Sequence, residues 1–231
     1  MPMTPTEVRR WRKAERERLI AARERLDAAT LEAWRRRIDA HLSRSFPGLA
    51  AATVAFCWPM RGEYDARDLV RALRDRGAVV ALPVVVAPGQ PLEFREWHPG
   101  MALATGPLGI SYPAASPSVA PTVALIPVNG WDQAGHRLGY GGGFFDRTLA
   151  GGPERPVAIG VGYEMARIET IRPQAWDVPM DWVVTERGVY RRDPGGLVFL
   201  DEAAPGEPSA LASPTCYAKE IAPGYFGEPE E

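Results

Sequence analysis

The sequence predicts an α/β fold built around a mainly parallel sheet. Several short apolar runs, rich in Val, Ile and aromatic residues, are typical of strands that are buried on both faces. These runs lie at 51–58, 78–86, 122–128, 156–163 and 181–186. Between the first two runs, residues 66–77 form a helical stripe that ends at Gly77, so this segment indicates a right-handed βαβ unit.

Two helices are predicted before the first strand. Apolar or small side chains recur three and four residues apart over residues 5–27, which indicates an amphipathic helix. A second helix is expected from about Thr30, with Asp27 or Thr30 as its N-cap. Residues 1–45 hold twelve Lys or Arg against seven Asp or Glu, so this part of the domain is basic.

The connections between these elements differ in composition. Residues 92–97 alternate between apolar and polar and predict a more exposed strand. Residues 98–121 are rich in Pro, Gly, Ser and Ala and predict a long loop, of the kind that is often functional. Residues 129–132 indicate a turn, and residues 144–150 indicate the beginning of a helix.

The chain is expected to form one domain over residues 1–200, followed by an acidic, Pro-rich tail over residues 201–231. The tail holds one Lys against seven Asp or Glu, a composition typical of disorder from Pro205 onward. Its aromatic residues nevertheless favour docking, and we expect the tail to pack near the basic first helix.

Composition argues against several classes of protein. The formal net charge of -2 gives no sign of nucleic-acid binding. The two cysteines, Cys57 and Cys216, lack the spacing of a disulfide framework or a zinc site, and the three histidines match no general-base arrangement. Because the sequence has neither an apolar leader nor a membrane-length apolar run, we expect a cytoplasmic protein that contacts no membrane.

Residues 137–147, RLGYGGGFFDR, concentrate four glycines and three aromatic residues between two arginines. A glycine-rich turn exposes backbone N–H groups to anions, which suggests a phosphate site. A dinucleotide fingerprint would need glycine at 144, and a Walker A loop would need Gly-Lys at 144 and 145, but both positions are Phe. The pattern is therefore a different phosphate loop or, as the alternative, a flexible hairpin tip.

The longer stretch PVNGWDQAGHRLGYGGGFFDRTLA (127–150) resembles the signature of the 5-formyltetrahydrofolate cyclo-ligase family, approximately P-G-x-A-F-D-x-x-G-x-R-L-G-x-G-x-G-Y-Y-D-R. PMRGEYDARDLV (59–70) and MDWVVTERGV (180–189) resemble two further family segments in the same order. The resemblance implies a three-layer α/β/α sandwich of the kind called NagB/RpiA/CoA-transferase-like, after the sugar-phosphate isomerases and CoA transferases.

The resemblance also implies a reaction and its partners. ATP would phosphorylate the formyl oxygen of 5-formyltetrahydrofolate, and ring closure by N10 would give 5,10-methenyltetrahydrofolate, ADP and phosphate. The resemblance implies Mg²⁺ as the metal and ATP as the co-substrate. It leaves open whether the folate carries a polyglutamate tail. We expect no nucleic-acid or membrane partner, and a monomer or homodimer.

The implied ATP site combines the glycine loop with the first helix. The glycines would let the backbone approach ATP while Arg137 pairs with a phosphate. The implied ATP-binding residues are Arg12, Lys13, Arg16, Arg137, Leu138, Gly139, Tyr140, Gly141, Gly142, Gly143, Phe144 and Phe145. Arg12 stands where the family has Lys, so Lys13 is the alternative cation. Arg12, Arg16 and Arg23 share one stripe of the helix, which without the family would indicate a solvated basic face.

The implied substrate-binding residues are Trp58, Glu63, Tyr140, Gly141, Gly142, Gly143 and Phe144, and the implied catalytic residues are Arg137, Tyr140 and Phe144. The acceptor-only carboxylate of Glu63 suits the N–H donors of a pterin ring. For Trp58, core packing is an equal alternative. Phe144 and Phe145 replace a Tyr pair of the family, so any role of those two hydroxyls is lost here.

The implied magnesium ligands are Asp146 and Asp181. Taken alone, each would be interpreted as a helix cap or turn residue. Glu63, Arg137, Asp146 and Asp181 are all present, which favours a working enzyme. One alternative is a paralogue on the same scaffold that acts on another formylated or carbonyl compound, which the missing tyrosine hydroxyls and Trp131 would favour. The other is a non-catalytic folate-binding or nucleotide-binding regulator.

Overall fold

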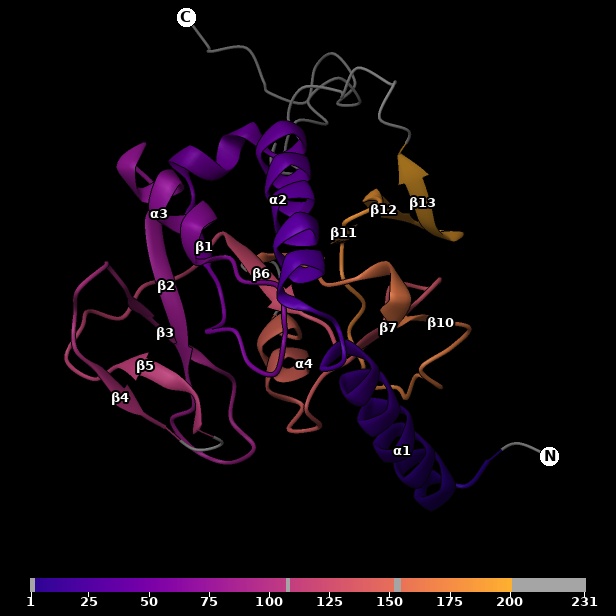
Figure 1. Ribbon diagram of the computed structural model, residues 1–231. Coiled ribbons are helices and arrows are strands. Elements are labelled where there is room, and N and C mark those ends of the chain that lie inside the picture. Colours follow the sequence, from indigo (N-terminus) through magenta and orange to yellow (C-terminus); the bar gives the residue numbers. More distant parts are fainter. Residues whose placement is uncertain (1–2, 107–108, 152–154, 201–231) are drawn as a thin grey trace, which may run out of the picture.

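The computed structural model describes residues 3–106, 109–151 and 155–200 (Figure 1). Its centre is a sheet of eight strands in the order β13-β12-β11-β9-β6-β1-β2-β3. The strands are β1 (Thr53–Ala55), β2 (Val79–Val84), β3 (Glu93–Glu96), β6 (Val123–Pro127), β9 (Val157–Val161), β11 (Trp182–Thr185), β12 (Gly188–Asp193) and β13 (Gly196–Leu200). Strands β2, β1, β6, β9 and β11 pair in parallel, and the strands at the two edges are antiparallel. The predicted α/β class with a mainly parallel sheet is confirmed.

Two helices cover one face of this sheet. α2 (Ala28–Ser45) contributes Ile38 and Leu42, and α3 (Arg67–Asp75) contributes Val70, to the larger core cluster above the central strands (Figure 1). α2 begins after Asp27, whose carboxylate accepts a hydrogen bond from the Thr30 backbone N–H at 2.8 Å, so Asp27 is the N-cap. Burial of these apolar side chains fixes both helices on the sheet.

The other face of the central sheet is covered by shorter elements. On this face lie the short helix α4 (Phe144–Leu149) and a second sheet of β10 (Arg167–Ile168), β7 (Gly130–Asp132) and β8 (Arg137–Leu138). A row of paired alanines, Ala81, Ala55, Ala124 and Ala158, crosses the central sheet within this smaller core cluster. Alanine side chains are short, so this layer can pack close to the strands.

The first helix, α1 (Pro5–Arg23), stands apart from the main core. Thr4 caps it, with a capping box formed by the Glu7 side chain. Its buried Leu19 packs with Leu138 and Ile171 in a small separate cluster. The helix ends at Arg23, four residues before the predicted limit of 27, because the chain turns there toward the N-cap of α2. Among the described residues, no helix combines the length and apolar character needed to cross a membrane.

Three local expectations are wrong or incomplete. The predicted loop at 98–121 contains a hairpin, β4 (Leu103–Thr105) with β5 (Ser111–Pro113), and the predicted turn at 129–132 contains β7. The hairpin formed by β12 and β13 was not predicted. Strands β4, β5 and β7 have three residues each, and β12 and β13 lie at the edge of the sheet, so their pairing is set by tertiary contacts and local composition carries little signal. The tail at 201–231, and with it the expected docking near α1, lies outside the described residues.

Candidate active site

A cavity of about 220 Å³ opens where the parallel strands β1, β2 and β6 reach their carboxyl ends. Ligands of open α/β sheets commonly bind at this end of the strands. The strand ends supply Cys57, Trp58, Pro83, Val85, Ile126 and Pro127, and the hairpin of β4 and β5 adds Gly106, Ile110 and Tyr112. The other walls come from α1, the glycine loop and the segment at 176–177.

The glycine loop forms the connection from β8 to α4 at the cavity wall, and every residue from 137 to 146 lines it. Gly141 and Gly143 have φ values of 94° and 64°, in the left-handed region that favours glycine. A Cβ atom on Gly141 would also come within 3.3 Å of the Arg16 guanidinium. The backbone path therefore requires glycine at 141 and 143, and the close approach of α1 is a second reason for glycine at 141.

Arg137 and Asp146 tie the two ends of the loop together. The Arg137 guanidinium donates to Asp146 Oδ1 at 2.9 Å and to the Val178 carbonyl oxygen at 2.7 Å. Asp146 Oδ1 also accepts the Val178 N–H at 3.2 Å, and no described donor binds Asp146 Oδ2. Burial lowers the pKa of Arg137, and the neighbouring Asp146 and Asp177 carboxylates oppose that effect.

Two of the predicted cations of α1 reach the cavity. Arg16 donates through Nε to the Gly139 carbonyl oxygen, and its burial lowers the pKa of its guanidinium. Arg12 donates to the carbonyl oxygens of Ile171 and Arg172 and pairs with Asp177. Arg16 therefore fixes the loop to α1, whereas Arg12 fixes α1 to the segment that carries Asp177.

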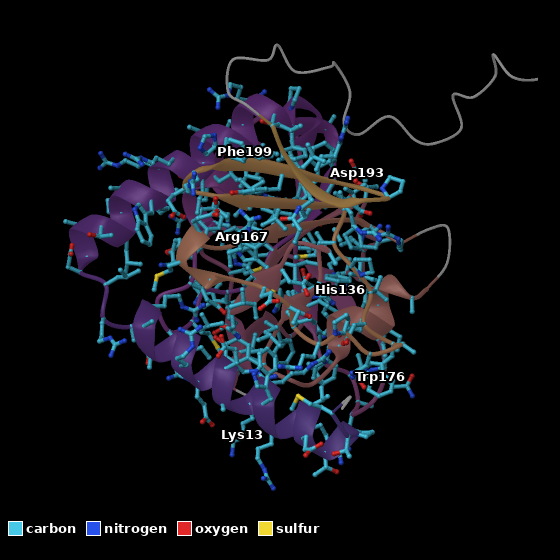
Figure 2. All side chains as sticks on the ribbon, turned by 90° about the vertical axis from the view of Figure 1, so that its right-hand side faces the viewer. Lys13, His136, Arg167, Trp176, Asp193 and Phe199 are labelled. Carbon is cyan, nitrogen blue, oxygen red and sulfur yellow. The ribbon has the colours of Figure 1, made fainter. Side chains whose placement is uncertain are left out.

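Lys13 does not line the cavity. Its side chain is 74% exposed, its ammonium lies 3.9 Å from Glu17, and Figure 2 shows it projecting outward from α1. Because α1 turns about 100° per residue, a residue next to Arg12 points in a different direction. The structure therefore brings Arg12 and Arg16 to the loop and leaves Lys13 in solvent.

The two predicted metal ligands lie in different surroundings. Asp146 lines the cavity, whereas Asp181 does not. The Asp181 carboxylate accepts two bonds from Arg155, at 2.6 and 2.9 Å, and one from the Ala158 N–H at 2.8 Å. The other aspartate that lines the cavity is Asp177. Over the described ranges, no group of three or more His, Cys, Asp or Glu side chains is arranged to hold a metal.

Glu63 and Tyr140 join the other end of the cavity to the loop. The Tyr140 hydroxyl donates to Glu63 Oε1 at 2.9 Å, and the Met60 N–H donates to Glu63 Oε2 at 3.0 Å. Burial raises the pKa of Glu63, while the nearby Arg23 cation opposes the rise. Burial and the Glu63 charge raise the pKa of Tyr140 to about 12, so this hydroxyl keeps its proton at neutral pH.

The aromatic residues serve the core and the cavity together. Trp58 lies edge-on to Trp97 at 6.2 Å and under the Arg67 guanidinium at 5.1 Å, and it also lines the cavity. Both interpretations of Trp58 therefore describe part of its surroundings. Phe144 lies under the Arg147 guanidinium at 5.1 Å, and Phe145 packs against the smaller core cluster. Both rings remain part of the cavity lining.

Sequence reasoning missed several lining residues. Trp176 is 67% exposed and lies at the surface in Figure 2, although its side chain lines the cavity. Asp177 follows it and is held by Arg12. Both belong to an irregular segment without periodicity, and only a Trp-Asp pair between two prolines marks it. Tyr112 lies in the segment whose composition predicted a functional loop.

Comparison with known proteins gives the family. The sequence profile of the 5-formyltetrahydrofolate cyclo-ligase family matches residues 8–186. The chain belongs to this family. The 5-formyltetrahydrofolate cyclo-ligase of Escherichia coli (strain K12) is 32% identical over 152 residues, which are 62% of this chain and 83% of that protein. The protein of the same name from Mycolicibacterium smegmatis is 30% identical over 151 residues, 61% of this chain and 77% of that protein.

Solved structures agree with the family. The NMR structure of Aquifex aeolicus 5,10-methenyltetrahydrofolate synthetase is similar at a TM-score of 0.68 and 26% identity, over 84% of this chain and 99% of that one. A 5,10-methenyltetrahydrofolate synthetase from Mycoplasma pneumoniae has a TM-score of 0.62 at 17% identity, over 76% and 98% of the two chains, and shows the shared fold alone. The predicted family is confirmed, and family membership supports the predicted cyclo-ligase class of enzyme.

Proposed function

We propose that this cyclo-ligase family member converts 5-formyltetrahydrofolate to 5,10-methenyltetrahydrofolate, with ATP as co-substrate and Mg²⁺ as the metal. The observation that carries the proposal is the hydrogen bond between Tyr140 and Glu63, which joins the glycine loop to a buried carboxylate in one cavity. A nucleotide on the loop and a folate on the carboxylate would then meet in the same space. Such proximity is what a transfer between two bound substrates requires.

The glycine loop suits the ATP end. Phosphoryl transfer depends on positioning and on neutralising charge more than on a strong nucleophile. The loop offers a backbone without side chains, and Arg16 and Arg137 place guanidinium groups at the same wall. The Arg137 guanidinium already donates hydrogen bonds to Asp146 and to the Val178 carbonyl oxygen, so its position is fixed before a phosphate binds.

The acids at this wall fit a magnesium ion. Mg²⁺ is commonly bound by one or two carboxylates together with substrate phosphates, so a cage of three acids is unnecessary. We propose Asp146 as the ligand, because Oδ1 is occupied by Arg137 and Val178 while Oδ2 has no described donor. Asp177 is the second carboxylate of the wall, and Asp181 would have to release Arg155 to contribute. When bound, the ion would neutralise charge on the phosphates.

Glu63 suits the pterin end. Each oxygen of an ionised carboxylate accepts more than one hydrogen bond, so Glu63 can retain Tyr140 and Met60 and still accept the N–H donors of a pterin. The rings of Trp58 and Phe144 lie on the same cavity and would cover the flat faces of the folate. Phe144 provides ring surface only, so no proton passes through this position.

The proposed reaction has two steps. The formyl oxygen attacks the γ-phosphorus of ATP, the bond to the bridging oxygen breaks, and ADP leaves. N10 then attacks the activated formyl carbon and loses its proton, and the former formyl oxygen departs with the phosphate. Arg137 is placed to stabilise the negative charge of the transferred group, while Tyr140 stays protonated and orients Glu63.

The direct test mixes the purified protein with 5-formyltetrahydrofolate, ATP and Mg²⁺ and follows the near-ultraviolet absorbance of the methenyl product. We expect a rise that needs all three components and releases phosphate in equal amount. No rise from folded protein, beside a working cyclo-ligase as positive control, would contradict the proposal. Omitting only Mg²⁺, in the presence of a chelator, tests the metal separately.

A further inference from the structure

A second, much smaller cavity lies next to Arg23, the last residue of α1. Its volume is about 10 Å³, which is about the space that one buried water molecule needs. Leu19, Val128 and Met165 make much of its wall apolar. Its polar side chains are those of Arg23, Asn129 and Tyr163. The cavity belongs to neither the glycine loop nor the predicted metal site.

Arg23 and Asn129 have buried polar atoms that lack a hydrogen-bond partner. Arg23 is 5% exposed and Asn129 is 2% exposed. Within the described part of the chain, Arg23 Nη2 and both Nδ2 and Oδ1 of Asn129 have no hydrogen-bond partner. Buried polar groups in native proteins are nearly always paired, with protein or with ordered water. One water molecule can accept bonds from the two nitrogens and donate one to the Asn129 oxygen.

Arg23 also reaches the buried carboxylate of the large cavity. Its Nη2 lies 3.8 Å from Glu63 Oε1, and its Nε donates to the Arg61 carbonyl oxygen at 2.9 Å. Arg61 and Gly62 have φ values of 50° and 74°, so the turn before Glu63 follows a left-handed path that needs outside support. Arg23 supplies that support to the turn and charge to the carboxylate.

We propose that Arg23 is a positioning residue for folate binding, which holds the Glu63 carboxylate toward the pterin ring and is itself held by a water molecule shared with Asn129. The ligand named here rests on the proposed function, but the link between Arg23 and Glu63 is a property of the free protein. The row of arginines on α1 is thereby divided. Arg12 and Arg16 lie at the phosphate end, and Arg23 lies behind the folate end.

Four elements bring ionisable groups to Glu63: Arg23 from α1, Cys57 after β1, Tyr140 from the glycine loop and Tyr163 after β9. Burial raises the pKa of the Cys57 thiol and raises the pKa of each tyrosine to about 12, so these three groups are neutral at pH 7. Arg23 is the cation among them. Removing its charge takes away the largest of the effects that oppose burial and leaves the hydrogen bonds from Met60 and Tyr140, so Glu63 should take up its proton at a higher pH.

The first experiment follows Glu63 in the free protein. The side-chain carboxyl carbon of Glu63 is titrated by ¹³C NMR, with its signal assigned from Glu63→Gln. We expect Arg23→Met to move the midpoint up by about one pH unit, and Arg23→Lys to restore most of the difference. Arg25→Met is the matched control, because it removes an exposed arginine two residues away and must leave the midpoint unchanged. An unmoved midpoint in folded Arg23→Met overturns the proposal.

The second experiment measures both substrates. Arg23→Met is expected to raise the KM for 5-formyltetrahydrofolate about tenfold and to leave the KM for ATP within about twofold. In the pH profile of kcat/KM for the folate, the acidic limb of Arg23→Met is expected to move to higher pH. Equal losses for both substrates would overturn the positioning role. If Arg23→Met does not fold, Arg23→Gln keeps a donor and replaces it in both experiments.

The water is tested by a high-resolution crystal structure. A density peak within hydrogen-bond distance of Arg23 Nη2 and Asn129 supports the proposal, and a dry cavity overturns the part that concerns water. If the wild-type protein fails to turn over 5-formyltetrahydrofolate while Arg23→Met still shifts the Glu63 midpoint, the proposed function fails and the inferred link stands. The proposed function and the inferred role of Arg23 can therefore be tested independently of each other.

Discussion

The cavity has two walls that are built in opposite ways. We name the walls after the proposed ligands. The phosphate wall consists of residues 137–146 with Arg12 and Arg16 of α1, and the folate wall consists of Trp58 and Glu63, with Arg23 behind Glu63. A single stretch of ten residues forms most of the phosphate wall, whereas the folate wall combines Trp58 and Glu63 of the β1–α3 connection with Arg23 of α1. The ten contiguous residues leave a long motif in the sequence, whereas the contact between Arg23 and Glu63 leaves no sequence signal, because the two residues lie far apart along the chain.

The two walls also differ in charge. At the phosphate wall, Arg137 is buried beside the partly exposed carboxylate of Asp146, so a cation is held ready for an anion. At the folate wall, the buried group is the acid Glu63, and burial raises its pKa. Tyr140 belongs to the loop but bonds to Glu63, and it is the point where the walls meet. Each wall can therefore be disabled on its own.

The largest expected effect comes from the phosphate wall. Asp146→Asn keeps an amide oxygen that can accept from Arg137 and Val178 but loses the charge that would bind Mg²⁺. We expect kcat to fall about 1,000-fold, since a catalytic metal stabilises the transition state by several kcal/mol. Activity is measured over a range of Mg²⁺ concentrations, beside thermal melting. Wild-type activity in folded Asp146→Asn would remove Asp146 from the metal site.

A second substitution at the same residue separates the effect on catalysis from the effect on stability. Asp146→Ala leaves the buried Arg137 without its carboxylate, and breaking such a partly buried pair is expected to cost about 2 kcal/mol of folding free energy. Asp146→Asn should cost less because the acceptor remains. If both substitutions lower the melting temperature equally, the ion pair is not what holds the loop.

The next effect tests the folate wall. Glu63→Gln replaces an acceptor-only carboxylate by an amide, and we expect the KM for 5-formyltetrahydrofolate to rise about 10-fold to 100-fold. The KM for ATP should stay within about twofold, which is the matched measurement on the other wall. A rise in the KM for ATP alone would contradict this prediction and assign Glu63 to the phosphate wall.

The pH dependence of the wild-type protein follows from the same residue. Burial raises the pKa of Glu63 above its ordinary 4.5, and the ionised form accepts the donors of the pterin. Folate binding should therefore be complete at neutral pH and fall as the pH drops through the raised pKa. Binding of the folate is measured between pH 4 and pH 8 for wild type and for Glu63→Gln, in which this acidic limb should disappear.

A smaller effect would assign Trp176 to one of the walls. Its indole lies at the cavity edge beside Asp177, which Arg12 holds, so we place it with the nucleotide. Trp176→Ala should raise the KM for ATP about fivefold, the usual value of one aromatic contact, and Trp176→Phe should restore most of it. A rise confined to the KM for the folate would move Trp176 to the folate wall.

The smallest effect is expected at Lys13. Lys13→Met removes an exposed charge that the structure places outside the cavity, so the KM for ATP should change by less than about twofold. Arg16→Met is the matched comparison on the same helix and should raise that KM about tenfold, because it also frees the Gly139 carbonyl oxygen. Equal effects at both positions would contradict the geometry of α1.

Much of the fold was accessible from local patterns. The five apolar runs became β1, β2, β6, β9 and β11, and the helical stripe between the first two became α3. Such strands are buried on both faces, so their sequences are apolar throughout and easy to find. The strands of the hairpins β4–β5 and β12–β13 were not predicted, because their pairing depends on the elements that lie beside them.

The sequence by itself determined the family, the parallel core and the loop at 137–146, because spacing, periodicity and glycine content act over a few residues and remain visible along the chain. Only the tertiary structure decided which distant groups meet. It brought Asp177 rather than Asp181 to the cavity, beside Arg12 from 165 positions earlier, and it separated Arg23 from the other arginines of its stripe. The physical reason is that convergence depends on how packed elements cross, and burial fixes those crossings only once the whole core has formed.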